Sequence, residues 1–182
     1  MKRPASAARK PLRRGKPALF LDRDGTLIED RHFLDSPDGV KLLPNAVRGL
    51  KAWIAAGYVP VIVTNQSGIA RGLFAWKRLR EIHRRLLDLL KKRGVVVEGI
   101  YVCPHLPQGK VRRYAKRCGC RKPKAGLLKR AARDLGLDLP ASVSIGDSIR
   151  DVEAGRAAGT RTILLGRDAR DLLDAYRGQH PP

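Results

Sequence analysis

The sequence predicts an α/β fold, in which a mainly parallel central sheet is covered by helices on both faces. Three observations predict it. Short apolar runs alternate along the chain with segments of helical periodicity. The 182 residues are enough for one domain with a single sizeable core. A composition of 43% hydrophobic and 30% charged residues excludes a disordered chain and a membrane protein.

Five apolar runs are the predicted strands. Aliphatic residues dominate these runs, as expected of strands that are buried on both faces of a parallel sheet. Polar residues that follow such runs are candidates for function, because ligands bind at the carboxyl ends of parallel strands. The predicted strands cover residues 18–21, 58–63, 99–102, 143–145 and 162–165.

Five segments carry apolar residues at helical spacing. In the first of them, Asn45 is the predicted N-cap and Gly57 the predicted C′ residue. Trp53 and Trp76 are expected in the core or at a helix start, and His83 is expected to be packed or exposed rather than catalytic. The predicted helices cover residues 45–56, 76–92, 125–135, 151–158 and 169–176.

The chain is strongly basic. Lys and Arg number 38 against 17 acidic residues, a net charge of +21, and such a charge attracts nucleic acid, acidic membrane surfaces or phosphorylated small molecules. Residues 1–17 hold seven bases and no acid. They lack the apolar stretch of a secretory signal, so we expect a disordered tail, with a nucleic-acid-binding arm as the alternative, followed by a single domain over residues 18–178.

Acidic residues stand directly after the first predicted strand. Asp22 and Asp24 are two residues apart there, and such carboxylates repel each other unless a cation lies between them or one holds a proton. A simple turn is the alternative, because Asp and Gly are common in loops. Thr64 follows the second strand, Lys122 precedes a helix and Asp147 follows the fourth strand. Residues of these types in this order indicate phosphoryl transfer.

Three cysteines and a histidine form two close pairs. Cys103-x-His105 is followed after 12 residues by Cys118-x-Cys120. Three thiolates and an imidazole suit a tetrahedral structural Zn²⁺ site, which leaves no position open for catalysis. The alternative is a set of buried free thiols with a surface histidine. A zinc ion here would fix the loop that carries Lys122, which follows Cys120 by two residues.

In these motifs the chain resembles phosphatases of the haloacid dehalogenase (HAD) superfamily. The four motifs of that superfamily are similar to residues 21–27, 63–65, 122 and 146–151. A closer resemblance is to its D,D-heptose 1,7-bisphosphate phosphatase branch, and it lies in residues 64–72, 103–105 and 118–123. The resemblance covers about residues 18–166. It implies a Rossmann-like three-layer fold with a minimal cap and a zinc-bound loop.

The resemblance implies a role for each residue at the strand ends. Asp22 would be the nucleophile that takes the phosphoryl group as an aspartyl phosphate, and Asp24 would act as general acid and then as general base. Mg²⁺ would be held by Asp22 and Asp147, with Asp24 contributing mainly its backbone carbonyl. Thr64 and Lys122 would hold the phosphoryl oxygens.

The resemblance also implies a substrate. The expected reaction removes the 7-phosphate of D-glycero-D-manno-heptose 1,7-bisphosphate, in the synthesis of nucleotide-activated heptose for the lipopolysaccharide core. Histidinol-phosphate phosphatase is the alternative, because that relative shares the motifs and the zinc loop. His32 and Phe33 stand where the branch more usually has Gly and Tyr. The expected phosphate- and substrate-binding residues are Asp30, Arg31, His32, Phe33, Thr64, Asn65, Gln66, Ser67, Arg121 and Lys122.

A nucleic-acid-binding protein, with or without 3′-phosphatase activity, is the alternative of another class. The net charge favours it, but the chain has no second recognition module and its basic tail has no aromatic residue. We therefore expect a small sugar phosphate as the partner, no specific nucleic-acid partner and no membrane, and a monomer in the cytoplasm. Asp151 either belongs to the phosphate site or only caps the helix that it opens.

Overall fold

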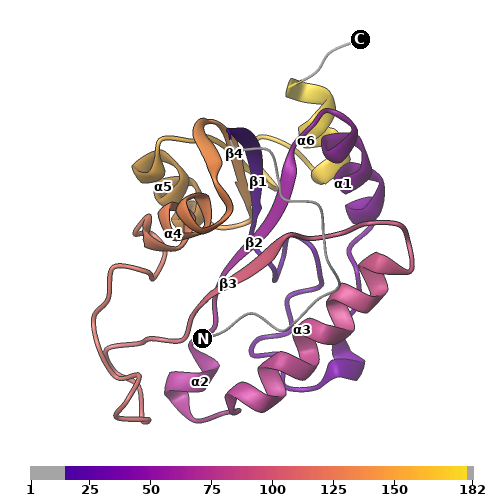
Figure 1. Ribbon diagram of the computed structural model, residues 1–182. Coiled ribbons are helices and arrows are strands. Elements are labelled where there is room, and N and C mark those ends of the chain that lie inside the picture. The colour runs from indigo at the N-terminus through magenta and orange to yellow at the C-terminus, as the bar shows by residue number, and fades with distance from the viewer. Residues whose placement is uncertain (1–14, 180–182) are drawn as a thin grey trace.

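The computed structural model describes residues 15–179. In this part of the chain, five strands form one parallel sheet in the order β3-β2-β1-β4-β5 (Figure 1). The predicted α/β fold with a parallel sheet is confirmed. The strands are β1 (Lys16–Leu21), β2 (Val59–Asn65), β3 (Gly99–Cys103), β4 (Leu137–Gly146) and β5 (Arg161–Leu164).

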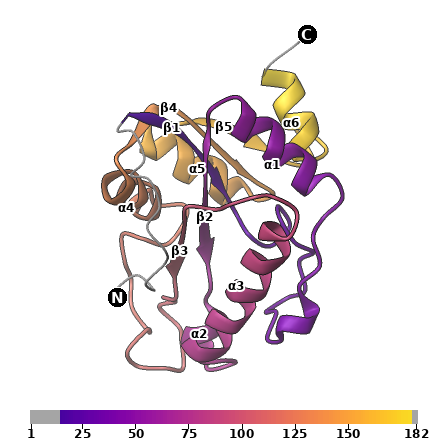
Figure 2. The ribbon, with the colours of Figure 1, turned by 45° about the vertical axis from the view of Figure 1, so that its right-hand side comes forward.

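Helices connect the strands and cover both faces of the sheet. They are α1 (Ala46–Ala55), α2 (Gly68–Arg71), α3 (Trp76–Lys91), α4 (Gly126–Leu135), α5 (Ile149–Ala158) and α6 (Leu172–Gln179), with a 3₁₀ helix η1 (Pro37–Gly39). Helices α1, α3 and α6 pack on one face, and α4 and α5 pack on the other (Figure 2). None of the helices within residues 15–179 is both long and apolar enough to cross a membrane.

Strand β1 shows how the sequence builds two hydrophobic cores. Successive side chains of a strand point to opposite faces of the sheet. Leu19 and Leu21 join the core beneath α1, α3 and α6, whereas Ala18 and Phe20 join the core beneath α4 and α5. All four side chains are fully buried. Packing on both faces fixes the end of β1, and with it the position of the next residue, Asp22.

The structure differs from the prediction at the start of the first strand and of the first helix. Strand β1 begins at Lys16, so two residues that the sequence assigns to the tail pair with β4, and residues 1–14 lie outside the described part. Asn45 occupies the N-cap position of α1, as predicted, but its side chain makes no capping bond and instead donates to Asp171 Oδ2 at 2.8 Å. Gly57 follows α1 with a φ of +91°, as predicted for a C′ residue.

Three elements in the last third of the chain begin at residues other than those predicted. Strand β4 begins six residues before the predicted strand, because Leu137 and Asp138 pair with β1 ahead of an irregularity. Helix α5 begins at Ile149 with Ser148 as its N-cap, so Asp151 lies inside the first turn and does not open the helix. Helix α6 begins three residues after its predicted start.

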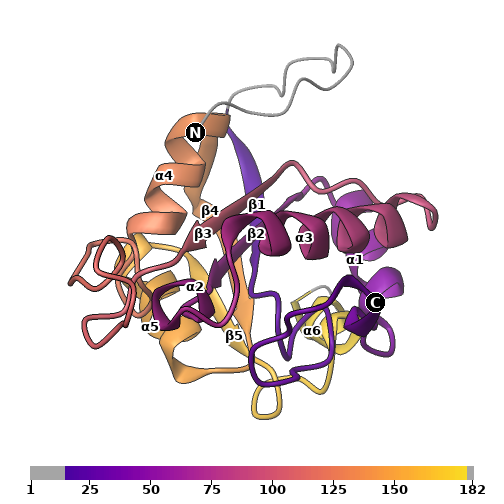
Figure 3. The same ribbon diagram turned by 90° about the horizontal axis from the view of Figure 1, so that it is seen from below.

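The loop between β3 and α4 lies beside α2 at the carboxyl edge of the sheet (Figure 3). Val111 N–H donates to the Ala70 carbonyl at 2.9 Å, and Trp76 Nε1 donates to the Tyr114 hydroxyl at 2.8 Å. These contacts connect the loop to α2 and to the start of α3. The loop that carries the cysteine pairs is therefore held at the edge where the polar residues follow the strands.

Candidate active site

Carboxylates from three segments meet at the carboxyl edge of the sheet. Asp22 follows β1, Asp147 follows β4 and Asp151 lies in the first turn of α5. One carboxylate oxygen of each lies within 4.8 Å of the other two. Asp151 combines both interpretations that the sequence allows. It belongs to this acidic cluster, and its Oδ2 accepts the Ser148 N–H at 3.1 Å in a capping box.

The ammonium group of Lys122 lies between two of these carboxylates. Its Nζ is 2.9 Å from Asp22 Oδ1 and 2.5 Å from Asp151 Oδ1, and it donates to the Val63 carbonyl at 2.8 Å. Burial alone would lower the pKa of Lys122, but the two carboxylates outweigh burial and raise the pKa. Lys122 is therefore charged at neutral pH, and its charge holds Asp22 at the end of β1.

The acidic cluster fits a divalent cation. Its three carboxylates share a single ammonium group, so negative charge remains uncompensated. Desolvation and then repulsion from Asp22 raise the pKa of Asp147 to about 6, which reflects this lack of positive charge. Hard carboxylate oxygens are the ligands that Mg²⁺ prefers. The donor set of Asp22, Asp147 and Asp151 therefore suits Mg²⁺.

Two glycines allow the segments of the site to approach one another. Gly25 has a φ of +70°, and a Cβ there would overlap the Asp147 carboxylate. A Cβ at Gly146 would overlap the Asp151 carboxyl group in the same way. A side chain at either position would displace a carboxylate of the acidic cluster. The Gly25 position in particular requires both a left-handed backbone and open space.

Asp24 has different partners from the acidic cluster. Its Oδ1 accepts from Arg23 Nη2 at 2.9 Å, and its Oδ2 accepts from Gln66 Nε2 at 2.9 Å. Arg23 Nε lies 3.2 and 3.1 Å from the same two oxygens. Gln66 Nε2 also donates to Thr64 Oγ1 at 2.9 Å. Both oxygens of Asp24 are thus held by donors from the segments that directly follow β1 and β2, and the Thr64 hydroxyl hydrogen remains able to donate.

Asn65 and Arg121 hold the backbone around the site. The Asn65 amide accepts the Lys122 N–H at 3.1 Å and donates to the Lys122 carbonyl at 3.0 Å. Arg121 Nη1 donates to the His105 carbonyl at 3.2 Å. Ser67 is buried at the start of α2 and makes no capping bond. The structure therefore gives Asn65 and Arg121 backbone partners, and it places Gln66 and Ser67 inside the protein.

The segment from Asp30 to Phe33 is an exposed loop. His32 and Phe33 both have positive φ, 43° and 69°, and the Asp30 carboxylate accepts the His32 N–H at 3.0 Å. The Arg71 guanidinium lies over the Phe33 ring, 5.3 Å from its centroid. Repulsion from Asp30 is one of the smaller contributions to the raised pKa of Asp147, so this loop lies within electrostatic reach of the acidic cluster.

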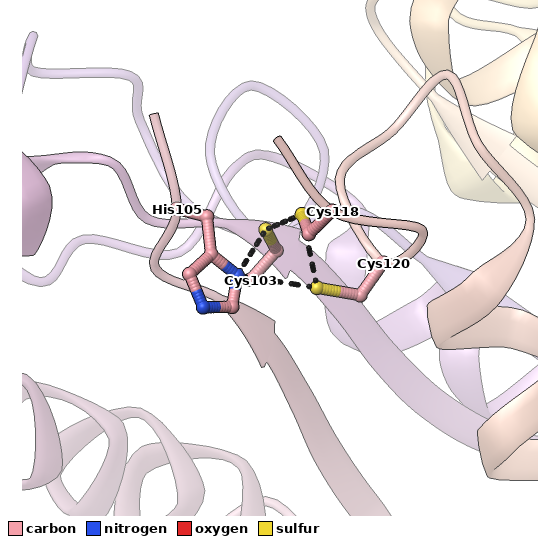
Figure 4. A group of neighbouring side chains, drawn as sticks. All are labelled: Cys103, His105, Cys118 and Cys120. Carbon is pink, nitrogen blue, oxygen red and sulfur yellow. Dashed lines mark hydrogen bonds between the residues drawn. The ribbon is translucent and has the colours of Figure 1, made fainter. Parts of the chain in front are cut away.

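The two cysteine pairs converge as a closed ring of four ligand atoms (Figure 4). Cys118 Sγ lies 3.6 Å from Cys103 Sγ and 3.4 Å from Cys120 Sγ, and His105 Nδ1 lies 3.7 and 3.5 Å from Cys103 Sγ and Cys120 Sγ. Sulfur ligands about 2.3 Å from one tetrahedral zinc lie roughly 3.8 Å apart. The three thiols are free. The spacing and the donor chemistry fit a zinc ion.

A buried pair beside Asp24 is absent from the sequence-based candidates. Arg23 is 1% exposed, and its Nη1 lies 3.2 Å from Nε2 of His83 on α3. The two residues are 60 positions apart, so neither spacing nor periodicity indicates that they meet. A charged residue between two aspartates at the end of a buried strand is the only local signal, because such a guanidinium needs partners when it is buried.

The chain is similar to known phosphatases over most of its length. The sequence model of the HAD-hydrolase-like family matches residues 119–182. The chain is 41% identical over 159 residues to D-glycero-beta-D-manno-heptose-1,7-bisphosphate 7-phosphatase of Haemophilus ducreyi, covering 87% of each protein. The protein of the same name from Yersinia pestis is 38% identical over 156 residues, covering 86% of this chain and 83% of that protein.

Solved structures agree with these relatives. A putative HAD-like phosphatase from Mesorhizobium loti is 32% identical with a TM-score of 0.82, covering 94% of this chain and 90% of that one. D,D-heptose 1,7-bisphosphate phosphatase from B. bronchiseptica, complexed with magnesium and phosphate, is 32% identical with a TM-score of 0.78, covering 90% and 97%. The chain therefore belongs to the D-glycero-beta-D-manno-heptose-1,7-bisphosphate 7-phosphatase family of HAD phosphatases.

Proposed function

We propose that this protein hydrolyses D-glycero-D-manno-heptose 1,7-bisphosphate at its 7-phosphate, through an aspartyl phosphate on Asp22. The observation that carries the proposal is the Lys122 ammonium group, which lies 2.9 Å from Asp22 and 2.5 Å from Asp151 at the edge of the sheet. A carboxylate held by a fixed ammonium can attack phosphorus while that same cation stabilises the phosphoryl oxygens. Family membership supports the substrate.

In the first step Asp22 attacks phosphorus and the bond from phosphorus to the sugar oxygen breaks. Asp24 gives its proton to that oxygen, so the sugar leaves as an alcohol. Lys122 and the Thr64 hydroxyl donate to the phosphoryl oxygens as charge moves onto them. Thr64 is suited to this because its Oγ1 already accepts from Gln66, which leaves its own hydrogen free.

In the second step water attacks phosphorus and the acyl phosphate bond breaks. Asp24, now a carboxylate, takes the proton of the attacking water, and Asp22 is restored with release of inorganic phosphate. The three donors on Asp24 fix the plane of its carboxylate for both steps. The same group can therefore serve as acid and then as base without changing its partners.

Mg²⁺ fits beside these residues. Asp22 and Asp147 would hold it with their carboxylates and Asp24 with its backbone carbonyl, and Asp151 lies within the same group of carboxylates. When bound, Mg²⁺ neutralises the phosphoryl charge and lets a carboxylate nucleophile approach an anionic substrate. The related B. bronchiseptica enzyme, crystallised with magnesium and phosphate, supports this assignment.

Zn²⁺ is proposed to have a structural role. Cys103, His105, Cys118 and Cys120 would fill all four positions of a tetrahedral ion, so no position remains for substrate. Lys122 follows Cys120 by two residues, and the Asn65 amide holds its backbone from the other side. Zinc and Asn65 would together fix where Lys122 enters the site.

Residues outside the acidic cluster are proposed to select the substrate. The exposed loop from Asp30 to Phe33 lies within electrostatic reach of Asp147, and Arg71 lies over Phe33. Arg31 and His32 in this loop and Arg121 beside the zinc ligands offer cations for a second phosphate or donors for sugar hydroxyls. Gln66 and Ser67 are buried, so we propose that they support the residues of the site and do not contact the substrate.

A phosphate-release panel tests the function. Heptose 1,7-bisphosphate, histidinol phosphate and a 3′-phosphorylated oligonucleotide are compared with Mg²⁺ present, and ³¹P NMR identifies the phosphate that is lost. We expect the heptose substrate to have a kcat/KM at least about tenfold above the others, a preference of about 1.4 kcal/mol. Preferred cleavage of either other substrate, or loss of the 1-phosphate, contradicts the proposal.

Two further measurements test the remaining expectations. Size-exclusion chromatography tests the expected monomer, and cell fractionation tests the expected cytoplasmic location.

A further inference from the structure

Arg23 is a buried charge whose donors are almost all used. Its guanidinium donates from Nε and Nη2 to the Asp24 carboxylate, from Nη2 to Gln66 Oε1 at 3.1 Å, and it meets His83 Nε2 through Nη1 at 3.2 Å. The residue is 1% exposed. A buried guanidinium persists only where its N–H groups find acceptors, because an unpaired one is costly. The cation is therefore fixed by one carboxylate, one amide oxygen and one ring nitrogen.

The contact with His83 requires a neutral imidazole. Arg23 can only donate, so Nε2 of His83 must be the accepting nitrogen and the proton of the ring must be on Nδ1. Burial and the Arg23 charge lower the pKa of His83 to about 3, in agreement with this geometry. His83 thus anchors the side of Arg23 that faces α3, opposite the side that holds Asp24.

We propose that Arg23 and His83 are positioning residues for Asp24: helix α3 fixes the orientation of the acid–base carboxylate through them. This inference rests on the proposed role of Asp24 as acid and base. His83 fixes Arg23, Arg23 fixes both oxygens of Asp24, and Gln66 connects the same carboxylate to Thr64. The arrangement joins the end of β1, the end of β2 and α3 in one hydrogen-bonded set.

A planar guanidinium is suited to this task. Its Nε and Nη2 hydrogens lie in one plane and meet both oxygens of Asp24 in a fork, so they determine the rotation of the carboxylate as well as its position. A Lys ammonium at the same place would keep the charge and lose the fork. Proton transfer to a leaving oxygen depends on the direction of the carboxylate. We therefore expect that changing Arg23 or its support lowers the rate of proton transfer more than it lowers the rest of the reaction.

The leaving group separates a positioning role from a structural role. An alkyl phosphate needs a proton on its leaving oxygen, whereas p-nitrophenyl phosphate releases an anion that needs none. The kcat/KM for each substrate reports phosphoryl transfer to Asp22, before water enters the reaction. We would measure it for p-nitrophenyl phosphate and for the best alkyl phosphate of the panel, in wild type, Asp24→Asn, Arg23→Lys, His83→Leu and His83→Gln.

For Asp24→Asn the expected loss on the alkyl phosphate exceeds the loss on the aryl phosphate by about 100-fold, the usual contribution of general acid catalysis. For Arg23→Lys and His83→Leu we expect an excess loss of roughly tenfold, equivalent to one hydrogen bond to a charged group. His83→Gln places an amide oxygen near the position of Nε2, so it should restore most of the rate that His83→Leu loses. The affinity for inorganic phosphate, measured by calorimetry, should change less than twofold in the His83 variants, since they leave Lys122 in place.

Equal losses on both substrates for Arg23→Lys and His83→Leu would overturn the inference, as would failure of His83→Gln to restore the rate. If His83→Leu does not fold, His83→Asn keeps a polar side chain but is too short to bring its acceptor to the position of Nε2, and it is judged by the same ratio of losses. Asp24→Asn separates the two claims. If it too loses both activities equally, the proposed role of Asp24 fails. If Asp24→Asn loses more activity on the alkyl phosphate than on the aryl phosphate, while the Arg23 and His83 variants lose equal activity on both, only the positioning inference fails.

Discussion

The two candidate metal sites are built in opposite ways. The candidate zinc ligands all come from one stretch between Cys103 and Cys120, and their four donor atoms lie at distances close to those around a tetrahedral ion. The acidic cluster collects carboxylates from the ends of two strands and from a helix, and Lys122 enters between them. The cysteine cluster needs only its own loop to bring its donors together. The acidic cluster forms only when the sheet aligns the ends of β1 and β4 with the start of α5.

The two clusters also differ in the chemistry and the charge of their donor atoms. Soft thiolate ligands select zinc, and hard carboxylates select magnesium, so the two sites should hold different metals. The four ligands of the cysteine cluster would leave no free position on a tetrahedral ion, whereas the acidic cluster keeps uncompensated negative charge that attracts a magnesium ion, which could in turn bind a substrate phosphate. Lys122 connects the two sites, because it follows the zinc ligands in the sequence and contacts Asp22 in space.

The largest expected effect is the loss of turnover in Asp22→Asn. The amide is nearly isosteric with the carboxylate but cannot attack phosphorus, so kcat should fall by more than about 100-fold. Because the zinc site is built from other segments, the zinc content measured by elemental analysis should stay at one per chain. A variant with more than about a hundredth of wild-type turnover would show that Asp22 is not the nucleophile.

Lys122→Met removes the cation between Asp22 and Asp151. We expect a loss of about 3–5 kcal/mol in the free energy of unfolding without Mg²⁺, because the buried Asp151 and the half-buried Asp22 carboxylate lose their partner. Mg²⁺ should restore part of this stability, since it supplies positive charge to the same oxygens. Urea unfolding with and without Mg²⁺ measures both effects.

Lys124→Met is the matched control, because this lysine is exposed two residues further on. Its unfolding free energy should stay within about 0.5 kcal/mol of wild type, as for most surface changes. If both variants lose the same stability, the ammonium between the carboxylates contributes nothing specific.

Cys120→Ser should break the cysteine cluster and disturb the acidic cluster less. We expect loss of zinc, a lower melting temperature and a decrease of roughly tenfold in kcat/KM, the size of effect that a changed supporting residue typically has. The decrease is partial because the Asn65 amide still holds the Lys122 backbone. Elemental analysis, thermal unfolding and kinetics measure the three quantities.

A weak chelator provides the converse treatment. It should remove Mg²⁺ and stop turnover reversibly while zinc stays bound, because the two ligand sets differ in hardness. Finding no zinc in metal-replete protein, or a disulfide between Cys103 and Cys118, would reject the zinc assignment.

The smallest expected effect concerns acid stability. The pKa of His83 is about 3 in the folded protein against 6.5 for an ordinary histidine, so between these values the unfolded chain binds a proton that the folded chain does not. Stability therefore falls as the pH drops from 6.5 toward 3. His83→Gln should lose less stability than wild type between pH 6.5 and 4.5, by on the order of 1 kcal/mol. His32→Gln is the control, because that side chain is 95% exposed, and an equal slope in all three proteins would contradict the prediction.

Much of the fold and of both clusters can be predicted from the sequence because their signals are local. Apolar runs mark the strands, and Asp22 and Asp147 directly follow two of them. Long-range contacts explain the errors. Asn45 stands at the N-cap position of α1, but its side chain makes no capping bond because its amide binds Asp171, 126 residues away. Asp138 and Pro140 interrupt the apolar pattern, which hides the first half of β4.

The contacts that support Arg23 beside Asp24 are also missed, because they join residues that are far apart in the sequence. His83 looks like an ordinary helix residue until the fold brings it 3.2 Å from Arg23. A periodicity argument assigns it to a helix face, but it cannot say which charged group that face meets.

The identity of the covalent intermediate tests most directly whether Asp22 is the nucleophile. Wild-type protein is mixed with substrate and Mg²⁺, quenched in acid within milliseconds, digested and analysed by mass spectrometry. If Asp22 is the nucleophile, a phosphoryl group lies on the peptide that contains Asp22, is located at that residue by borohydride reduction, and is missing from Asp22→Asn. Release of phosphate without any phosphorylated intermediate, or a phosphoryl group on another residue, would contradict it.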